Sequence, residues 1–274
     1  MYGPFPRVAS RRSPPVARRV VALHSSRHRL ALPPGAPPRR ALLCGTPGQR
    51  PRAMTPAVIV DSLEFRYGAR TVFSGISFSI ATGERVGLAG PNGAGKSTLL
   101  WCLMGLLRPH AGRAEIRVPF GAVFQNPEDE LFMPSILEDA ALPLENRGLS
   151  RQQALQRARE ALAAVGLDHA AGRPGHALSA GERKRAALAC ALALQPGVLL
   201  LDEPTSELDP RSARVLAAHL NDLHCAKFIA SHDLPFLRRT TSRLLILDGA
   251  RLAADGSTEA LLEDEALLIR HGLK

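Results

Sequence analysis

The chain has 274 residues and a formal net charge of +10 at pH 7, from 35 Lys and Arg against 25 Asp and Glu. Residues 1–53 contain eleven Arg and no Lys, Asp or Glu, whereas residues 54–274 hold 24 basic and 25 acidic side chains. The larger part is therefore almost neutral. This argues against a nucleic-acid partner, because proteins that bind nucleic acid carry a basic face. Apolar stretches also stay far below the roughly 18 residues that a membrane-spanning helix needs.

Residues 1–53 include ten of the 22 prolines and show no period typical of a helix or a strand. Such a segment cannot bury enough apolar surface to offset the entropy of ordering it, so we expect a disordered Arg/Pro-rich tail. Three interpretations stay open: translation starts at Met54, which we favour, or the tail is a basic arm, or it is a targeting peptide. Residues 54–274 are long enough for one large α/β domain.

The first elements after the tail are rich in β-branched and aromatic residues. Runs at 58–65 and 71–80 predict antiparallel strands, and a third strand is expected at 85–89. A glycine-rich segment follows this strand and leads directly into an apolar stretch, 99–107, with helical spacing. The order is therefore strand, glycine loop and helix.

Helices and buried strands alternate through the rest of the chain. Helical spacing occurs at 150–165, 179–194 and 212–223. Continuous apolar runs, which fit strands buried on both faces of a parallel sheet, occur at 198–201, 227–230 and 244–247. The sequence thus predicts an α/β core with an antiparallel β edge and a mostly helical insertion at about 126–190.

The glycine-rich segment reads GPNGAGKST and satisfies the pattern G-x-x-x-x-G-K-[ST]. Glycines let successive backbone N–H groups surround a phosphate, and the next helix presents its positive N-terminus to it. Lys96 is expected to reach the β- and γ-phosphates, and the Ser97 hydroxyl to ligate Mg²⁺. We therefore predict that the phosphates of a nucleotide bind here together with Mg²⁺, on Gly90, Pro91, Asn92, Gly93, Ala94, Gly95, Lys96, Ser97 and Thr98.

Two acidic residues, Asp202 and Glu203, come at the end of the buried run 198–201. This is the carboxyl edge of a parallel sheet, where the ligands of α/β proteins bind. Asp202 is expected to hold Mg²⁺ through its water shell, and Glu203 to polarise the attacking water. The structural alternative is that the pair caps a helix N-terminus.

Residues 178–182, LSAGE, resemble the signature motif of ATP-binding-cassette (ABC) ATPases, and the resemblance extends over 57–256. It implies a P-loop NTPase fold of the ABC-ATPase type with a helical signature subdomain. By this resemblance Tyr67 stacks on adenine, Gln125 is the Q-loop residue that acts in catalysis and ligates Mg²⁺, Asp209 belongs to the D-loop, and His232 contacts the γ-phosphate.

The signature residues are Leu178, Ser179, Ala180, Gly181 and Glu182. Ala180 stands where glycine is usual in the family, and Glu182 replaces the common glutamine. The basic run that follows, 183–185, is interpreted as a solvated helix face, with a contact to a partner as the alternative.

In this family the signature of one subunit closes over the nucleotide of another. The single set of motifs therefore implies a homodimer, or a heterodimer with a related ATPase. Glu203, His232 and Gln125 are the residues to which the resemblance assigns catalysis. The segment after Gln125, residues 126–147, is the expected docking surface for a membrane subunit, which would place the chain on the cytoplasmic face of a membrane.

The same segment, with QNPEDELF and the later NRGL, resembles the energy-coupling-factor ATPases. These belong to importers of cobalt, nickel and vitamins, and they work with a membrane coupling subunit and a substrate-binding membrane subunit. Cobalt or nickel is the first candidate for the substrate, and biotin or another vitamin is the next. An exporter ATPase and a soluble ABC ATPase outside transport remain the alternatives.

Overall fold

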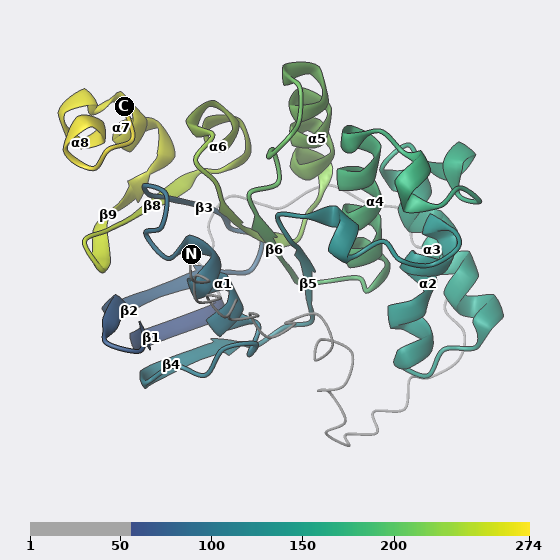
Figure 1. Cartoon of the computed structure of the whole chain (residues 1–274), viewed down its shortest axis with the longest axis horizontal. Coiled ribbons are helices and arrows are strands. Elements are labelled where there is room, and N and C mark those ends of the chain that lie inside the picture. The colour runs from purple at the N-terminus through teal and green to yellow at the C-terminus, as the bar shows by residue number, and fades with distance from the viewer. Residues whose placement is uncertain (1–55) are drawn as a thin grey trace, which may run out of the picture. The chain divides into compact units, whose positions relative to one another are not determined.

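The computed structural model describes residues 56–274, so the interpretations of residues 1–53, including disorder and a start at Met54, lie outside the described residues. Two sheets form the frame of the described part (Figure 1). The first is antiparallel, in the order β2 (Arg70–Ala81), β1 (Pro56–Tyr67) and β4 (Ala111–Ile116). The expected antiparallel strands thus form a sheet of their own.

The second sheet has the order β5 (Phe120–Val123), β6 (Val198–Asp202), β7 (Ala226–Ala230), β3 (Arg85–Ala89), β8 (Arg243–Asp248) and β9 (Arg251–Ser257). Its neighbours are parallel except for β9, which pairs antiparallel with β8. The runs predicted at 85–89, 198–201, 227–230 and 244–247 are all strands of this sheet. Because β3, β5, β6 and β7 run in the same direction, the loops that follow them gather at one edge.

Helices surround the second sheet. They are α1 (Lys96–Leu103), α2 (Ile136–Asn146), α3 (Arg151–Ala164), α4 (Ala180–Ala193), α5 (Pro210–Asp222), α6 (Leu234–Thr240), α7 (Thr258–Glu263) and α8 (Glu265–Arg270). Between β5 and β6 lie α2, α3 and α4, which pack against one another, and short 3₁₀ turns at Pro127–Asp129, Asp168–Ala170 and Gly175–Ala177. Figure 1 shows this group beyond β5, at the opposite side from α7 and α8.

Helix α1 differs from its predicted range. It starts at Lys96, inside the glycine-rich segment, and ends at Leu103 instead of extending to 107. The early end follows from Gly105, whose φ of 73° continues the chain in the left-handed region directly after the C-cap residue Met104. The other predicted helices, in α3, α4 and α5, agree with the structure to within two residues at each end.

The alternation of side chains along β6 divides the core. Val198 and Leu200 join the cluster formed with β1, β2 and α1, whereas Leu199 and Leu201 join the cluster formed with α2 to α6. A strand buried on both faces needs this continuous apolar run. The central sheet is thus covered on both sides, which fixes the edge where its loops emerge.

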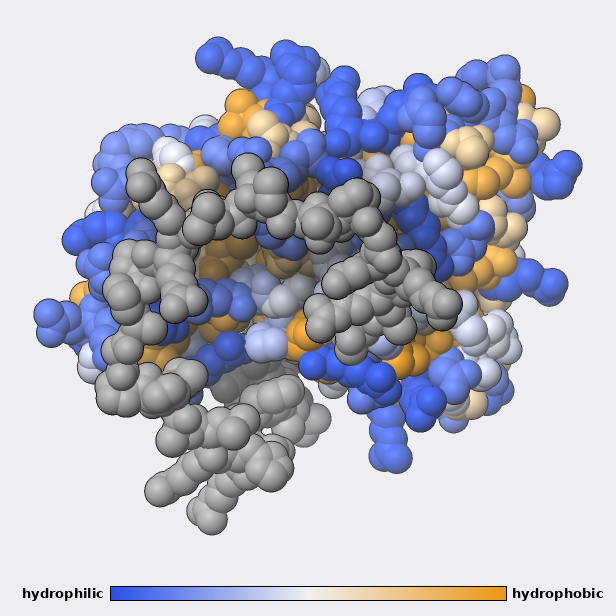
Figure 2. All heavy atoms as spheres, turned by 180° about the vertical axis from the view of Figure 1, so that it is seen from behind, coloured by the Kyte–Doolittle hydropathy of each residue, from blue (hydrophilic) through white to orange (hydrophobic). Residues whose placement is uncertain are grey.

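The surface of the described part is mixed. In the coloured area of Figure 2, hydrophobic side chains form small patches between hydrophilic ones. Among residues 56–274, four large hydrophobic side chains are exposed: Tyr67, Phe132, Val215 and Ile269. Within residues 56–274, the helices are all too short or too polar to cross a membrane.

Candidate nucleotide-binding site

The glycine-rich loop lies between the end of β3 and the start of α1. A Cβ atom on Gly90 would lie 2.3 Å from the backbone oxygen of Leu247 in β8. Gly95 has a φ of 103°, and a Cβ atom there would lie 2.4 Å from the side chain of Val72. Both positions therefore require glycine, one for close packing and the other for conformation as well. The loop is held against two different sheets.

Lys96, the first residue of α1, folds back over this loop. Its Nζ donates a hydrogen bond to the backbone oxygen of Gly90 at 2.9 Å and lies 3.5 Å from Oε1 of Glu203. Both side chains are less than a tenth exposed. A buried ammonium and a buried carboxylate are thus paired at the edge of the sheet, where the loops after β3 and β6 meet.

Glu203 is held from three sides. Its backbone φ of 44° lies in the left-handed region, which turns the chain sharply at the end of β6. Its Oε2 accepts hydrogen bonds from the Ser231 hydroxyl and the His232 backbone N–H, both at 3.1 Å, and lies 2.8 Å from His232 Nδ1. The His232 ring is about 61% exposed. The carboxylate therefore has a fixed orientation between a buried lysine and a solvent-facing histidine.

The neighbouring carboxyl group, Asp202, has a different environment. It is buried, and its Oδ1 atom has no hydrogen-bond partner among residues 56–274. Desolvation raises the pKa of Asp202, while a hydrogen bond with the Ser97 side chain opposes that rise. A hydroxyl beside an unpartnered carboxylate oxygen supplies the hard oxygen ligands that Mg²⁺ prefers. Ser97 and Asp202 therefore fit a magnesium ion.

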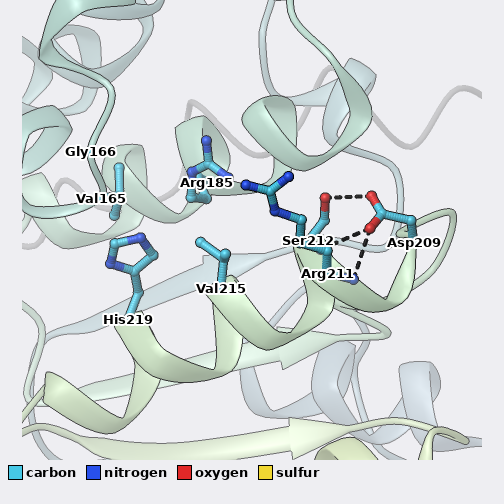
Figure 3. Close-up of a pocket in the computed structure, with 8 residues that line it drawn as sticks. All are labelled: Val165, Gly166, Arg185, Asp209, Arg211, Ser212, Val215 and His219. Carbon is cyan, nitrogen blue, oxygen red and sulfur yellow. Dashed lines mark hydrogen bonds between the residues drawn. The ribbon is translucent and has the colours of Figure 1, made fainter.

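Asp202 and Glu203 do not cap the next helix, so the structural alternative for this pair is wrong. The next helix, α5, is capped by Asp209, which accepts hydrogen bonds from the N–H groups of Arg211 and Ser212 at 2.8 and 3.0 Å (Figure 3). The Ser212 hydroxyl also donates to Asp209, at 2.6 Å. The D-loop candidate is thus an N-cap in this structure.

A cavity of about 540 Å³ joins the predicted residues. Its lining includes Tyr67, Asn92, Gly93, Gly95, Lys96, Ser97, Thr98, Gln125, Glu203 and His232. Two further lining residues, Arg70 and Val72, come from β2 and were not singled out in the sequence. They have no motif of their own, and their place at the cavity follows from β2 packing against the glycine loop. The ring of Tyr67 is half exposed at this cavity and packs edge-on against Phe65, with ring centroids 4.9 Å apart.

The signature residues lie elsewhere, around the N-terminus of α4, and do not line this cavity. Ser179 and Glu182 form a capping box: the Ser179 hydroxyl accepts from the Glu182 N–H at 3.3 Å, and Glu182 accepts from the Ser179 N–H at 2.8 Å. The Ser179 hydroxyl also donates to the Glu182 carboxylate, at 2.8 Å, and the bonds that this carboxylate accepts from the Ser179 N–H and hydroxyl lower the pKa of Glu182. Gly181 packs on α5, where an added Cβ atom would lie 2.8 Å from the Ser212 hydroxyl. The residue that replaces the common glutamine thus completes a helix cap.

The interpretation of 183–185 as a solvated helix face is wrong for its central residue. Lys184 is 2% exposed, because it points from α4 toward the turn after β5. Arg183 and Arg185 are partly buried, and each has a buried Nε without a partner among the described residues. Arg185 lines a second cavity, of about 510 Å³, with Asp209 and His219 (Figure 3).

Comparison with known proteins identifies the family. The family model described as "ABC transporter" matches residues 73–206. A chain of Gloeobacter violaceus named as an ABC transporter ATP-binding protein is 43% identical over 237 residues, which cover 81% of this chain and 97% of that one. The chain belongs to the ABC transporter ATP-binding proteins. It is therefore an ABC-type ATPase with the ABC-ATPase fold.

The chain is also similar to two ABC proteins whose names state the transporter or complex to which they belong. The energy-coupling factor transporter ATP-binding protein EcfA of Methanocaldococcus jannaschii is 36% identical over 236 residues, 79% of this chain and 85% of that one. The solved structure of CbiO1 from Clostridium perfringens, part of the ABC transporter complex CbiONQ, has a TM-score of 0.68 and 30% identity. It covers 78% of this chain and 93% of CbiO1. The resemblance to energy-coupling-factor ATPases is thus confirmed at the level of family.

Proposed function

We propose that this ABC ATPase powers the import of a micronutrient as part of an energy-coupling-factor transporter, with cobalt or nickel as the first candidate. The similarity to EcfA and CbiO1 supports import. So does the pattern QNPEDELF at the start of residues 126–147. The substrate would be selected by a separate membrane subunit, so this chain supplies the hydrolysis.

The arrangement around Glu203 carries the proposed mechanism. Lys96 pairs with Glu203 in the described structure, and a bound nucleotide would offer Lys96 a phosphate in place of that carboxylate. Glu203 Oε1 would then be free to accept a proton from water, while Oε2 stays fixed by the loop after β7. His232 would contact the γ-phosphate, and Tyr67 would stack on the base.

The loop residues 90–98 would surround the phosphates with their backbone N–H groups. Ser97, Asp202 and the Gln125 amide would hold a magnesium ion, which neutralises phosphate charge when bound. The unpartnered Asp202 oxygen supports this assignment. Glu203 is therefore assigned to the water, and Asp202 to the metal.

The first test is Glu203→Gln, which keeps the size of the side chain and removes the base. We expect ATP turnover to fall by at least about 100-fold, because general-base catalysis contributes factors of this order. ATP affinity, measured by equilibrium binding, should change little. Turnover like that of the unaltered chain would refute the assignment of Glu203 as the base.

The signature residues would act on a nucleotide held by another subunit. Their place outside the cavity of their own chain supports this, since its lining does not include Leu178 to Glu182. Ser179, exposed at the N-terminus of α4, would present its hydroxyl and the free helix N–H groups to the γ-phosphate. A homodimer, or a heterodimer with a related ATPase, would thus hold two nucleotides.

Residues 126–147 are the proposed docking surface for the membrane coupling subunit, which would hold the chain at the cytoplasmic face of the membrane. Phe132 is 63% exposed there, although its backbone is fixed. Asp139 accepts hydrogen bonds from the N–H groups of Phe132 and Met133 at 3.0 and 2.9 Å. A rigidly presented aromatic side chain is a good anchor for a partner surface.

The second test is Phe132→Ser, examined by affinity purification of the full chain from detergent extract. We expect the unaltered chain to recover membrane proteins and the variant to lose most of them, because a central aromatic anchor often contributes about 2 kcal/mol or more. Ile269→Ser, on α8 at the other side of the described part, is the matched control and should retain them. Recovery of soluble partners alone would contradict a transport function. A separate experiment, the uptake of labelled cobalt, nickel or biotin, would identify the substrate.

A further inference from the structure

The buried lysine of the signature helix connects three parts of the site. Lys184 Nζ donates hydrogen bonds to the backbone oxygen of Gln125 and to the Ser206 hydroxyl, the latter at 3.1 Å. The Ser206 hydroxyl also donates to the Gln125 oxygen, at 3.3 Å. The three residues come from α4, from the turn after β5 and from the loop after β6, three positions beyond Glu203. They form a closed triangle of hydrogen bonds, called here the Lys184 triangle.

The turn that carries Gln125 is fixed at its base as well. Glu130 Oε1 accepts the Phe124 N–H at 2.7 Å, and Asn126 Oδ1 accepts the Glu128 N–H at 3.2 Å. Lys184 thus holds the backbone carbonyl of Gln125, while Gln125 itself lines the nucleotide cavity. The position of Gln125 therefore depends on where α4 places Lys184.

Packing alone gives no reason for a lysine at this position. Lys184 is 2% exposed, and it has no ion pair within 4.0 Å among residues 56–274. Desolvation lowers the pKa of Lys184, and the more distant carboxyl groups of Glu130, Glu207, Asp202 and Glu203 act in the opposite direction. A buried charge held by neutral acceptors is less favourable than an apolar side chain of the same size. What the lysine supplies is its two donated hydrogen bonds, to the Gln125 oxygen and to the Ser206 hydroxyl.

We propose that Lys184 is a positioning residue that ties the backbone of Gln125 and the Ser206 hydroxyl to the signature helix. Lys184 follows the signature residue Glu182 by two positions on α4. A shift of the signature end of α4, when it meets a nucleotide on another subunit, would therefore move Gln125 in the cavity of its own chain. The two composite sites of a dimer would be coupled through this residue. The inference rests on the proposed role of Gln125.

The test compares Lys184→Met with Lys184→Gln in the full chain. Met fills the same space without donors, whereas the Gln amide keeps donors for the Gln125 and Ser206 oxygens. For Lys184→Met we expect kcat to fall at least about tenfold, which corresponds to about 1.4 kcal/mol of transition-state stabilisation. Equilibrium ATP affinity should stay within about twofold, because Lys184 does not line the cavity. Lys184→Gln should recover most of the lost kcat.

Lys227→Met is the matched control for the loss of a buried lysine. Lys227 is 1% exposed, and its Nζ donates to the backbone oxygens of Leu223 and Cys225 at 2.7 and 3.1 Å, outside the site. Because both variants replace a buried lysine with an apolar side chain of similar size, Lys227→Met should shift the melting temperature in the same direction as Lys184→Met and leave kcat unchanged. If Lys184→Met lowers kcat no more than Lys227→Met does at a temperature where both are folded, the inference is overturned.

A double-mutant cycle with Ser206→Ala tests the triangle itself. If Lys184 and Ser206 position the same carbonyl, Lys184→Met should lower kcat by a smaller factor in the Ser206→Ala background than alone. Factors that multiply would overturn the inference. Should Lys184→Met fail to fold, the same cycle is run with Lys184→Arg, whose longer and planar head group is expected to displace the turn and lower kcat.

Gln125→Ala separates this inference from the proposed function. If Gln125→Ala leaves kcat unchanged, the proposed role of Gln125 fails, and the inference fails with it. If Gln125→Ala lowers kcat and Lys184→Met does not, only the inference about Lys184 is overturned. Hydrogen exchange of the peptide around Gln125 should be faster in Lys184→Met than in Lys227→Met, and equal exchange would likewise contradict a positioning role.

Discussion

Gly90 shows how one residue joins the nucleotide loop to the rest of the sheet. Its Cα lies so close to β8 that a Cβ atom would approach the Leu247 backbone oxygen to 2.3 Å. A backbone oxygen in a central strand cannot move aside, unlike the end of a flexible side chain. The phosphate-loop pattern requires glycine at position 90, and the packing against β8 requires it as well. Both requirements exclude a Cβ atom at this position.

Gly90→Ala should accordingly destabilise the fold by about 1–3 kcal/mol, the usual range for overpacking a core, and weaken ATP binding. The measurements are urea unfolding and equilibrium nucleotide binding. Gly172→Ala is the control, because a Cβ atom at Gly172 meets nothing within 4 Å and its φ is not in the left-handed region. Equal stability of the two variants would show that the loop can shift away from β8.

Motif residues could be located from the sequence because their spacing reflects contacts made within one short segment. Lys96 and Ser97 are set by the loop and the helix turn that contain them, and Asp202 and Glu203 by the end of one strand. Arg70, Val72 and Lys184 could not be found in this way. Their positions depend on packing between segments distant in the chain, and for Lys184 that partner is 59 residues away.

Capping boxes start two helices of the insertion. In α4 the box joins Ser179 and Glu182, and in α3 it joins Ser150 and Gln153. The two helices have the same length, so the pair allows a direct comparison of a carboxylate and an amide in the same role. The carboxylate at α4 also interacts favourably with the positive end of the helix.

Glu182→Ala should therefore destabilise the chain by about 1 kcal/mol, the usual effect of losing a cap, and Gln153→Ala by no more than this. Glu182→Gln should retain the box and most of the stability. Thermal unfolding at neutral pH and moderate salt gives the comparison. A larger loss for Gln153→Ala would mean that the charge of Glu182 contributes nothing at the start of α4.

Elements with a strong period or a continuous apolar run were predictable, as in β3, β6, α3 and α4. β4 and β9 were not predicted, because both lie at sheet edges and expose much of their length, so their sequences carry no clear apolar pattern. Helices α7 and α8 have six residues each, too short for a helical period to be recognised. The site was affected little by these omissions, since none of these four elements contributes a residue to the lining of the cavity.

At the scale of the whole molecule, the phosphate loop and the signature occupy different regions. The loop lies at the edge of the central sheet beside β2, while the signature begins α4 in the insertion. The nucleotide cavity contains no signature residue, and the described part of the chain is nearly neutral overall. Two chains facing each other in opposite directions would complete two sites at once, since a two-fold interface repeats every contact.

Mixing two inactive variants tests this arrangement. Lys96→Ala removes the phosphate contact, and Ala180→Asp places a negative charge at the signature, at a position where an acidic residue suits the start of α4. Each variant alone should be inactive, because both of its composite sites are defective. In a mixed dimer, the intact phosphate loop of the Ala180→Asp chain faces the intact signature of the Lys96→Ala chain. One of the two sites is therefore complete, and the other carries both defects. Random pairing of equal amounts makes half of the dimers mixed, and each mixed dimer has one complete site of two. The mixture should therefore regain up to about a quarter of normal turnover, and less than this where the two sites are coupled. No recovery in a mixture shown to exchange subunits would contradict a homodimer with signatures acting between chains.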